Sequence, residues 1–200
     1  MKIPNIFKSN KNASTRNSKV KFSIGELENT ETEFDYGKIY EISETSIKIS
    51  ANEKQVELLT KLVNNLNPPF YFLYVLVVSR TEKGIGRYQS PLFENRYELI
   101  NFLVKYQEYF ETDGRHHIWI GTTDNSGILV YDQHNVIFGY GAMNKFKKTI
   151  SKIGYKEKEF EFPAPYCHSF HVENDDYEKS IVNYFDWELF PLQPQDTYDE

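Results

Sequence analysis

The segment from Tyr71 to Val78 reads YFLYVLVV, a nearly continuous apolar run of residues that favour β-structure. A strand with one solvated face alternates apolar and polar side chains, and this run shows no such alternation. The pattern is typical of a strand that is covered on both faces, so we expect it inside a sheet. The run is well short of the roughly 20 residues that cross a bilayer. Because no apolar segment follows Met1 either, we expect no membrane partner and no signal peptide.

A hairpin and two helices are predicted on either side of this strand. Isoleucines alternate with polar residues around a Ser-Glu-Thr-Ser turn, which predicts a hairpin over 37–50. Apolar residues at helical spacing predict a helix that is capped by Asn52 and stopped at Pro68. The same spacing predicts a second helix over 95–111, which the Asp-Gly pair beginning at Asp113 ends.

The region 116–140 has the pattern of a three-stranded meander. Three apolar stretches, 116–122, 128–132 and 136–140, are separated by the turn signals Asp-Asn-Ser-Gly and Gln-His-Asn. Strands joined by such short turns pair antiparallel. We therefore place this meander at the centre of the sheet.

The remaining elements complete an α+β fold. We expect a helix over 143–153, a strand over 157–162 with its phenylalanines on one face, a Pro-bounded loop over 163–171, and a last helix that begins at Asn174 or Asp175. This order predicts a mostly antiparallel sheet with helices packed on it.

The domain organisation follows from composition. Residues 1–19 are rich in Asn, Ser and Lys without a period and predict a disordered basic tail. Residues 20–190 predict a single α+β domain, and 191–200 predict an acidic C-terminal tail.

The meander also holds three of the five histidines. If its first turn is centred on the Asn-Ser pair, Trp119 lies opposite Asp132. His117 then lies opposite His134, and the four side chains share one face, whereas His116 points to the other. We expect structural hydrogen bonds among them. The alternative is a catalytic site of a small hydrolase-like enzyme, in which Asp132 orients His117 or His134 as a general base.

A second group of candidate ligands lies in the sequence CHSFH. Cys167, His168 and His171 are of the residue types that bind zinc. If this loop folded over the meander, His134 could join His168 and His171, which would make a metal-assisted enzyme. A structural zinc site needs four ligands, and the usual Cys-x-x-Cys pair is missing. We therefore expect no metal and no other cofactor.

Motifs of known enzymes are missing from the sequence. The stretch KGIGRYQSP, 83–91, has glycines two apart but lacks the third glycine and the Lys-Ser pair of nucleotide-binding loops. We predict a flexible loop there. The sequence also contains no Gly-x-Ser-x-Gly and no His-Glu-x-x-His, which favours a protein that is not an enzyme.

Charge is distributed unevenly along the chain. The net charge is −6; residues 1–19 carry five basic groups and no acid, and residues 173–200 carry nine acids and one lysine. Nucleic acids require a basic face, so we expect no nucleic-acid partner. The acidic end suits a basic partner or serves solubility. The single cysteine, Cys167, fits a reducing cytoplasm.

Part of the chain resembles a family of small bacterial proteins with no defined activity. The likeness covers roughly 84–171 and is carried by GRYQSPLFENRYELINFLVKYQEYFETDGRHHIWI, LVYDQHNVIFGYG and PAPYCHSFH. In size, acidity and lack of catalytic motifs the chain is also similar to the immunity proteins that neutralise bacterial polymorphic toxins. The resemblance implies no catalytic residues.

These observations lead to two functional hypotheses. The first is an intracellular binding protein of the immunity or inhibitor type, which neutralises a protein toxin or a similar basic partner through acidic and aromatic surface. The second is the His/Asp-dependent, possibly metal-assisted enzyme described above. For the first, the expected partner-binding residues are Trp119, Tyr131, Tyr140, Asp175, Asp176, Trp187 and Glu188.

Overall fold

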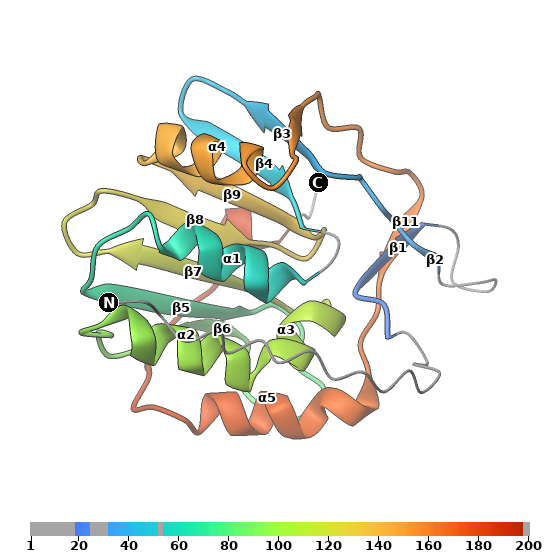
Figure 1. Ribbon diagram of the computed structural model, residues 1–200. Coiled ribbons are helices and arrows are strands. Elements are labelled where there is room, and N and C mark those ends of the chain that lie inside the picture. Colours follow the sequence, from blue (N-terminus) through green and yellow to red (C-terminus); the bar gives the residue numbers. More distant parts are fainter. Residues whose placement is uncertain (1–18, 25–31, 52–53, 198–200) are drawn as a thin grey trace, which may run out of the picture.

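The computed structural model describes residues 19–24, 32–51 and 54–197, which form an α+β fold (Figure 1). A nine-stranded sheet runs in the order β10-β3-β4-β9-β8-β7-β5-β6-β12, and only β10 pairs parallel with its neighbour. The predicted fold class is confirmed. The strands are β3 (Ile39–Ile42), β4 (Ser46–Ser50), β5 (Phe70–Leu76), β6 (Gly86–Gln89), β7 (His116–Thr122), β8 (Ile128–Tyr131), β9 (Val136–Tyr140), β10 (Lys156–Glu157) and β12 (Glu188–Phe190).

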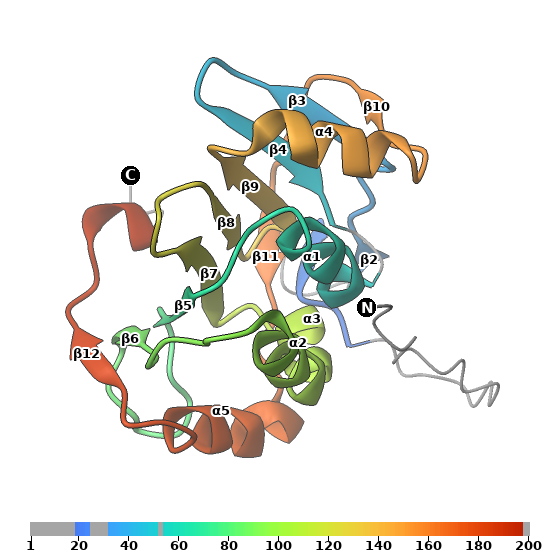
Figure 2. The same cartoon turned by 60° about the vertical axis from the view of Figure 1, so that its left-hand side comes forward.

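Five helices pack on one face of this sheet (Figure 2). They are α1 (Gln55–Val63), α2 (Arg96–Lys105), α3 (Gln107–Thr112), α4 (Met143–Ser151) and α5 (Asp175–Val182). The helix expected over 95–111 is in fact two helices that meet at Tyr106. Asn95 caps α2, because its side chain accepts the backbone N–H of Glu98. The cap expected at Asn52 lies outside the described residues.

Strand β5 lies inside the sheet, as its apolar run predicts. It pairs with β7 on one side and β6 on the other. Phe72 and Tyr74 are fully buried on the face that the helices cover. On the opposite face Val75 is also fully buried, and Leu73 is 9% exposed. Burial on both faces removes the need for polar alternation in this strand.

The meander forms, but its register differs from the expected one by two residues. Trp119 pairs with Val130 rather than with Asp132, and His134 lies in the β8–β9 turn rather than opposite His117. The Thr122 hydroxyl accepts the backbone N–H of Ser126, which places the turn earlier than the sequence signal indicated. Because side chains alternate with a period of two, a shift of two residues leaves His117, Trp119 and Asp132 on their expected face, whereas His134 in the turn packs against Phe22 and His168.

Several short strands lie where the sequence predicts a loop or no regular element. The expected loop over 83–91 contains β6, and the expected strand over 157–162 shrinks to β10. A separate three-stranded sheet packs beside the meander, at the right of Figure 1. Its strands are β1 (Phe22–Ile24), β2 (Thr32–Glu33) and β11 (Tyr166–His168), the last from the expected loop over 163–171.

The C-terminal segment is packed against the domain at least to residue 197, although the sequence predicts a tail from 191. Residues Pro194–Asp196 form a 3₁₀ turn, and Asp196 is 2% exposed. Most of the expected basic tail over 1–19 lies outside the described residues. In the part of the chain that the structure describes, no helix combines the length and apolarity that crossing a bilayer would require.

Arg115 links α5 to the start of β7 through buried ion pairs. Its guanidinium is fully buried and contacts both carboxylate oxygens of Asp113, at 2.7 and 3.0 Å. It also pairs with Glu178 and Asp175 on α5, at 2.5 and 3.0 Å. Asp175 and Glu178 therefore hold the fold together, so much of the acidic charge at the start of α5 is neutralised within the molecule.

Candidate functional site

The face of the sheet opposite α1–α5, here called the open face, carries an aromatic surface. The strand registers place one row of side chains across it, and Trp119, Val130 and Phe138 lie next to one another in the middle of that row. Trp119 and Phe138 are half-buried rather than covered. The whole row consists of Glu41, Lys48, Phe138, Val130, Trp119, Leu73, Gln89 and Glu188.

A second row of the open face adds two tyrosines. Tyr140 is 38% exposed, and Tyr71 is half-buried. The Tyr71 ring lies across Gly121, where a Cβ atom would come within 2.1 Å of the ring. Glycine is thus required at 121 for the ring to lie flat on β7. Together the two rows place aromatic and aliphatic side chains across β5, β7, β8 and β9, here called the aromatic patch.

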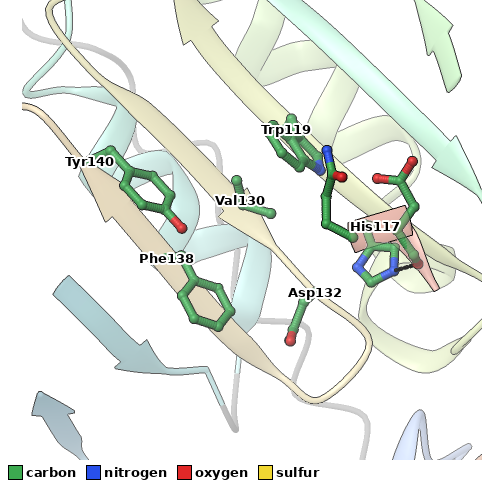
Figure 3. Close-up of a pocket in the computed structure, with 8 residues that line it drawn as sticks. His117, Trp119, Val130, Asp132, Phe138 and Tyr140 are labelled. Carbon is green, nitrogen blue, oxygen red and sulfur yellow. Dashed lines mark hydrogen bonds between the residues drawn. The ribbon is translucent and has the colours of Figure 1, made fainter. Parts of the chain in front are cut away.

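A pocket of about 180 Å³ opens in this face (Figure 3). Val130, Trp119, Phe138 and Tyr140 supply its apolar walls, and its other lining residues are polar. Sites for drug-sized ligands measure about 300–1,000 Å³, whereas an engineered cavity of about 150 Å³ holds one benzene. The pocket therefore has room for one side chain or a very small molecule. The polar lining residues are His117, Asp132, Gln195 and Asp196.

The C-terminal segment closes one end of the pocket. The His117 Nε2–H donates to the backbone oxygen of Asp196 at 3.1 Å (Figure 3). The Asp196 carboxylate accepts the backbone N–H of Gln193 at 2.7 Å and forms an ion pair with Arg87 at 3.1 Å. The Arg87 guanidinium also lies 5.1 Å from the centre of the Trp119 ring, at cation–π distance. These contacts hold Trp119 and the C-terminal segment in place together.

Asp132 closes the turn between β8 and β9. Its Oδ1 accepts the backbone N–H groups of His134 and Val136, at 2.9 and 3.0 Å, and its Oδ2 lies 3.0 Å from His134 Nδ1. Burial acts to raise the pKa of the Asp132 carboxyl. The hydrogen bond and the charge of His134 lower this pKa, and so do the charge of His117 and the hydrogen bond from the Val136 N–H. The result is a pKa below the ordinary value. The ionised Asp132 carboxylate thus stabilises the turn through these hydrogen bonds.

The structure brings the three candidate catalytic residues close together, but Asp132 and His134 stabilise the β8–β9 turn and His117 hydrogen-bonds to the C-terminal segment. His117 and His134 are each 4% exposed, and Asp132 is 2% exposed. Burial lowers the pKa of His117 to about 4, so its imidazole is neutral at neutral pH. A general base must come within hydrogen-bond reach of a substrate proton. Because these side chains are buried and hydrogen-bonded within the fold, we assign them structural roles. Asp132 and His134 stabilise the β8–β9 turn, and His117 holds the C-terminal segment.

The candidate metal ligands do not converge. The His134 and His168 rings pack edge to face with centres 4.8 Å apart, but the His171 Nε2–H donates to the Val20 backbone oxygen. Burial lowers the pKa of His168 to about 3. Among residues 19–24, 32–51 and 54–197, no group of three or more His, Cys, Asp or Glu side chains is placed to hold a metal ion.

The residues expected at a partner surface are divided among different environments. Trp119 and Tyr140 lie on the open face, and Glu188 is exposed at its edge. Tyr131 does not fit the expectation, because it is 1% exposed and its ring lies under the Lys21 ammonium at 3.8 Å.

Three further expected residues lie near α5. Trp187 packs against the core on the helix-covered face, with its indole N–H donating to the Ile181 oxygen at 2.9 Å. Asp175 is engaged with Arg80 and Arg115. The Asp176 side chain is 96% exposed.

Sequence reasoning missed Phe138, Arg87 and the C-terminal segment. The alternation of β9 carried a signal for Phe138, since it shares a face with Tyr140. The contact between Arg87 and Asp196 joins distant parts of the chain, and no local pattern reveals it.

Comparisons of the chain with known protein families, with curated proteins and with solved structures found no match. The geometry of the open face is therefore the basis for a functional assignment.

Proposed function

We propose that this protein binds another protein through the open face of its sheet, as an intracellular domain of the immunity or inhibitor type. The main support for the proposal is the apolar and aromatic nature of the side chains that point outward from the open face. The solvated face of an antiparallel sheet is normally polar, but here Trp119, Phe138 and Tyr140 lie together on it with Val130 between them. Apolar patches with a polar rim are typical of protein-interaction sites.

The residue types on this face are those that dominate binding energy. Tryptophan, tyrosine and arginine are enriched among the few interface residues whose truncation costs 2 kcal/mol or more. The Arg87 stack and the Asp196 ion pair hold the Trp119 ring before any partner arrives. A side chain that is already ordered loses less entropy on binding.

Charge supports a basic partner, such as a bacterial toxin held inactive in the cytoplasm. The net charge of the chain is −6. Asp176 and Glu188 are exposed, whereas Asp175 and Glu178 are engaged with Arg115. Opposite charge on two partners mainly accelerates their association and excludes wrong partners.

Photo-crosslinking in cells of the source organism tests the proposal. A benzophenone amino acid replaces Tyr140 on the open face or, as the control, Tyr97 on α2, which is 58% exposed. We expect a discrete crosslinked protein from position 140 and none from position 97. Equal yields from both positions, or a product from position 97 alone, would refute the proposal.

A further inference from the structure

The pocket of the open face has a chemistry that defines what it accepts. We infer that it receives a basic side chain, a lysine or arginine, from the protein partner. The inference rests on the proposed function and adds the type of residue that the partner inserts. Three independent features of the pocket support it: its charge, its walls and its size.

The charge of the lining is negative. Asp132 and Asp196 line the pocket, and no lysine or arginine is among its lining residues. The one imidazole, His117, is neutral at neutral pH because burial lowers its pKa to about 4. Arg87 pairs with Asp196, but its guanidinium lies against Trp119 rather than in the lining. Asp132 is engaged with the β8–β9 turn and Asp196 with Arg87, so the two carboxylates act on an entering cation through their charge, of which the neighbouring Arg87 offsets one.

The walls suit the rest of a basic side chain. Trp119, Phe138 and Tyr140 lie around Val130 and form the aromatic walls of the pocket (Figure 3). Lysine and arginine pack their methylene stems against apolar surface and place their charged groups at its polar end. Aromatic faces attract a cation by a further cation–π term, which is largest for tryptophan. Gln195 adds an amide oxygen that accepts a hydrogen bond.

The size fits a single side chain. About 180 Å³ is close to the volume of a cavity that holds one benzene and is below that of a cofactor site. A single arginine side chain, with its guanidinium and methylene stem, fits into this volume, whereas a nucleotide or a folded peptide loop is too large for it.

The test uses N-acetyl-arginine amide and, as its neutral near-isostere, N-acetyl-citrulline amide. The full chain carries Trp187→Phe, so that Trp119 is its only tryptophan and reports pocket occupancy by fluorescence. We expect saturable quenching with the arginine amide and roughly tenfold weaker binding of the citrulline amide, since charge and cation–π attraction are lost. Equal affinities, or no saturation with the arginine amide, would overturn the inference.

Two pocket variants and one control variant locate the binding in the pocket. Tyr140→Ala removes one aromatic wall and should weaken binding of the arginine amide several-fold, whereas Tyr97→Ala on α2 should leave it unchanged. Asp196→Asn should weaken it as well, because it removes one carboxylate. If all three variants bind the arginine amide as tightly as the parent chain, the pocket is not the site and the inference is wrong.

The two proposals fail in different ways. If a protein crosslinks from position 140 but the arginine amide neither binds the pocket nor lowers the crosslinking yield, the inference about the pocket is wrong and the proposed function stands. If the arginine amide binds the pocket but no protein crosslinks from position 140, the proposed function is wrong, and the pocket instead serves a small basic molecule.

Discussion

At the residue scale, Asp132 shows how one carboxylate organises a turn. It accepts two backbone N–H groups and faces His134, and all of these contacts lie in a buried place. Asparagine at 132 would keep an acceptor for the backbone but lose the charge. Bonds to charged groups contribute about 1.5–3 kcal/mol, roughly twice those between neutral groups.

Asp132→Asn should therefore lower the free energy of unfolding by about 1–3 kcal/mol at pH 7. The folded pKa of Asp132 lies below its ordinary value, so its contribution is complete above the unfolded value near 3.9 and is lost as pH falls through the folded value. Urea unfolding at pH 7 and below pH 3 measures this. A penalty of the same size at both pH values would show that the carboxylate charge is unimportant.

The buried imidazoles predict a separate pH dependence. Burial lowers the folded pKa of His117 to about 4 and that of His168 to about 3. Such a group has no effect above its unfolded pKa near 6.5 and destabilises the fold progressively as pH falls from 6.5 toward the folded value. Each contributes a slope of at most about 1.4 kcal/mol per pH unit.

The free energy of unfolding should accordingly decline between pH 6.5 and 4, and His117→Gln should make that decline shallower. Glutamine retains a donor for the Asp196 oxygen, so the variant should still fold. An unchanged slope in the variant would mean that His117 is already accessible to protons in the folded protein.

At the element scale, Arg115 joins β7 to α5 through three carboxylates. Removing one partner from a buried ion network leaves uncompensated charge and costs about 3–5 kcal/mol. Arg115→Met should destabilise the fold by about this amount. Arg80→Met is the matched control, because the Arg80 side chain is 40% exposed and exposed pairs contribute about 0–1 kcal/mol. Similar losses in thermal or urea unfolding would contradict the structural role of Arg115.

Gly121 and Tyr71 are coupled across β7 and β5. Alanine at 121 places a Cβ atom against the outer end of the half-buried Tyr71 ring, so the ring must turn aside, at a cost of about 0.5–1.5 kcal/mol. In a Tyr71→Ala background the same substitution should cost little. A double-mutant cycle in urea measures the coupling. Additive effects would mean that the ring does not lie over Gly121.

At the scale of the whole molecule, the sequence patterns predict the centre of the sheet better than its edges. The apolar run of β5 and the alternation of the meander are long enough to show a period. Strands β10, β11 and β12 have two or three residues each, too few for any period to appear. Their positions depend on tertiary packing, such as the pairing of β12 with β6.

For the candidate site, the sequence predicted which face of the sheet the strand residues lie on, but not which of them are buried. Alternation placed His117, Trp119 and Asp132 on one face even though the register was off by two residues. Burial was not predictable, so the sequence did not distinguish the covered Tyr131 from the accessible Tyr140. The C-terminal segment looked like a solvated tail because its anchoring depends on Arg87, which is distant in sequence.

We propose that the aromatic open face is the surface that binds the partner. The most direct test is the affinity of the purified chain for the protein captured by crosslinking, determined by calorimetry for Phe138→Glu and for Tyr97→Glu. A charge in the centre of the aromatic patch should weaken binding at least about 30-fold, the equivalent of a 2 kcal/mol hot spot, whereas Tyr97→Glu should change it less than about threefold. Unaltered affinity in Phe138→Glu, with Tyr97→Glu weakened, would place the interface on the helices and contradict this account.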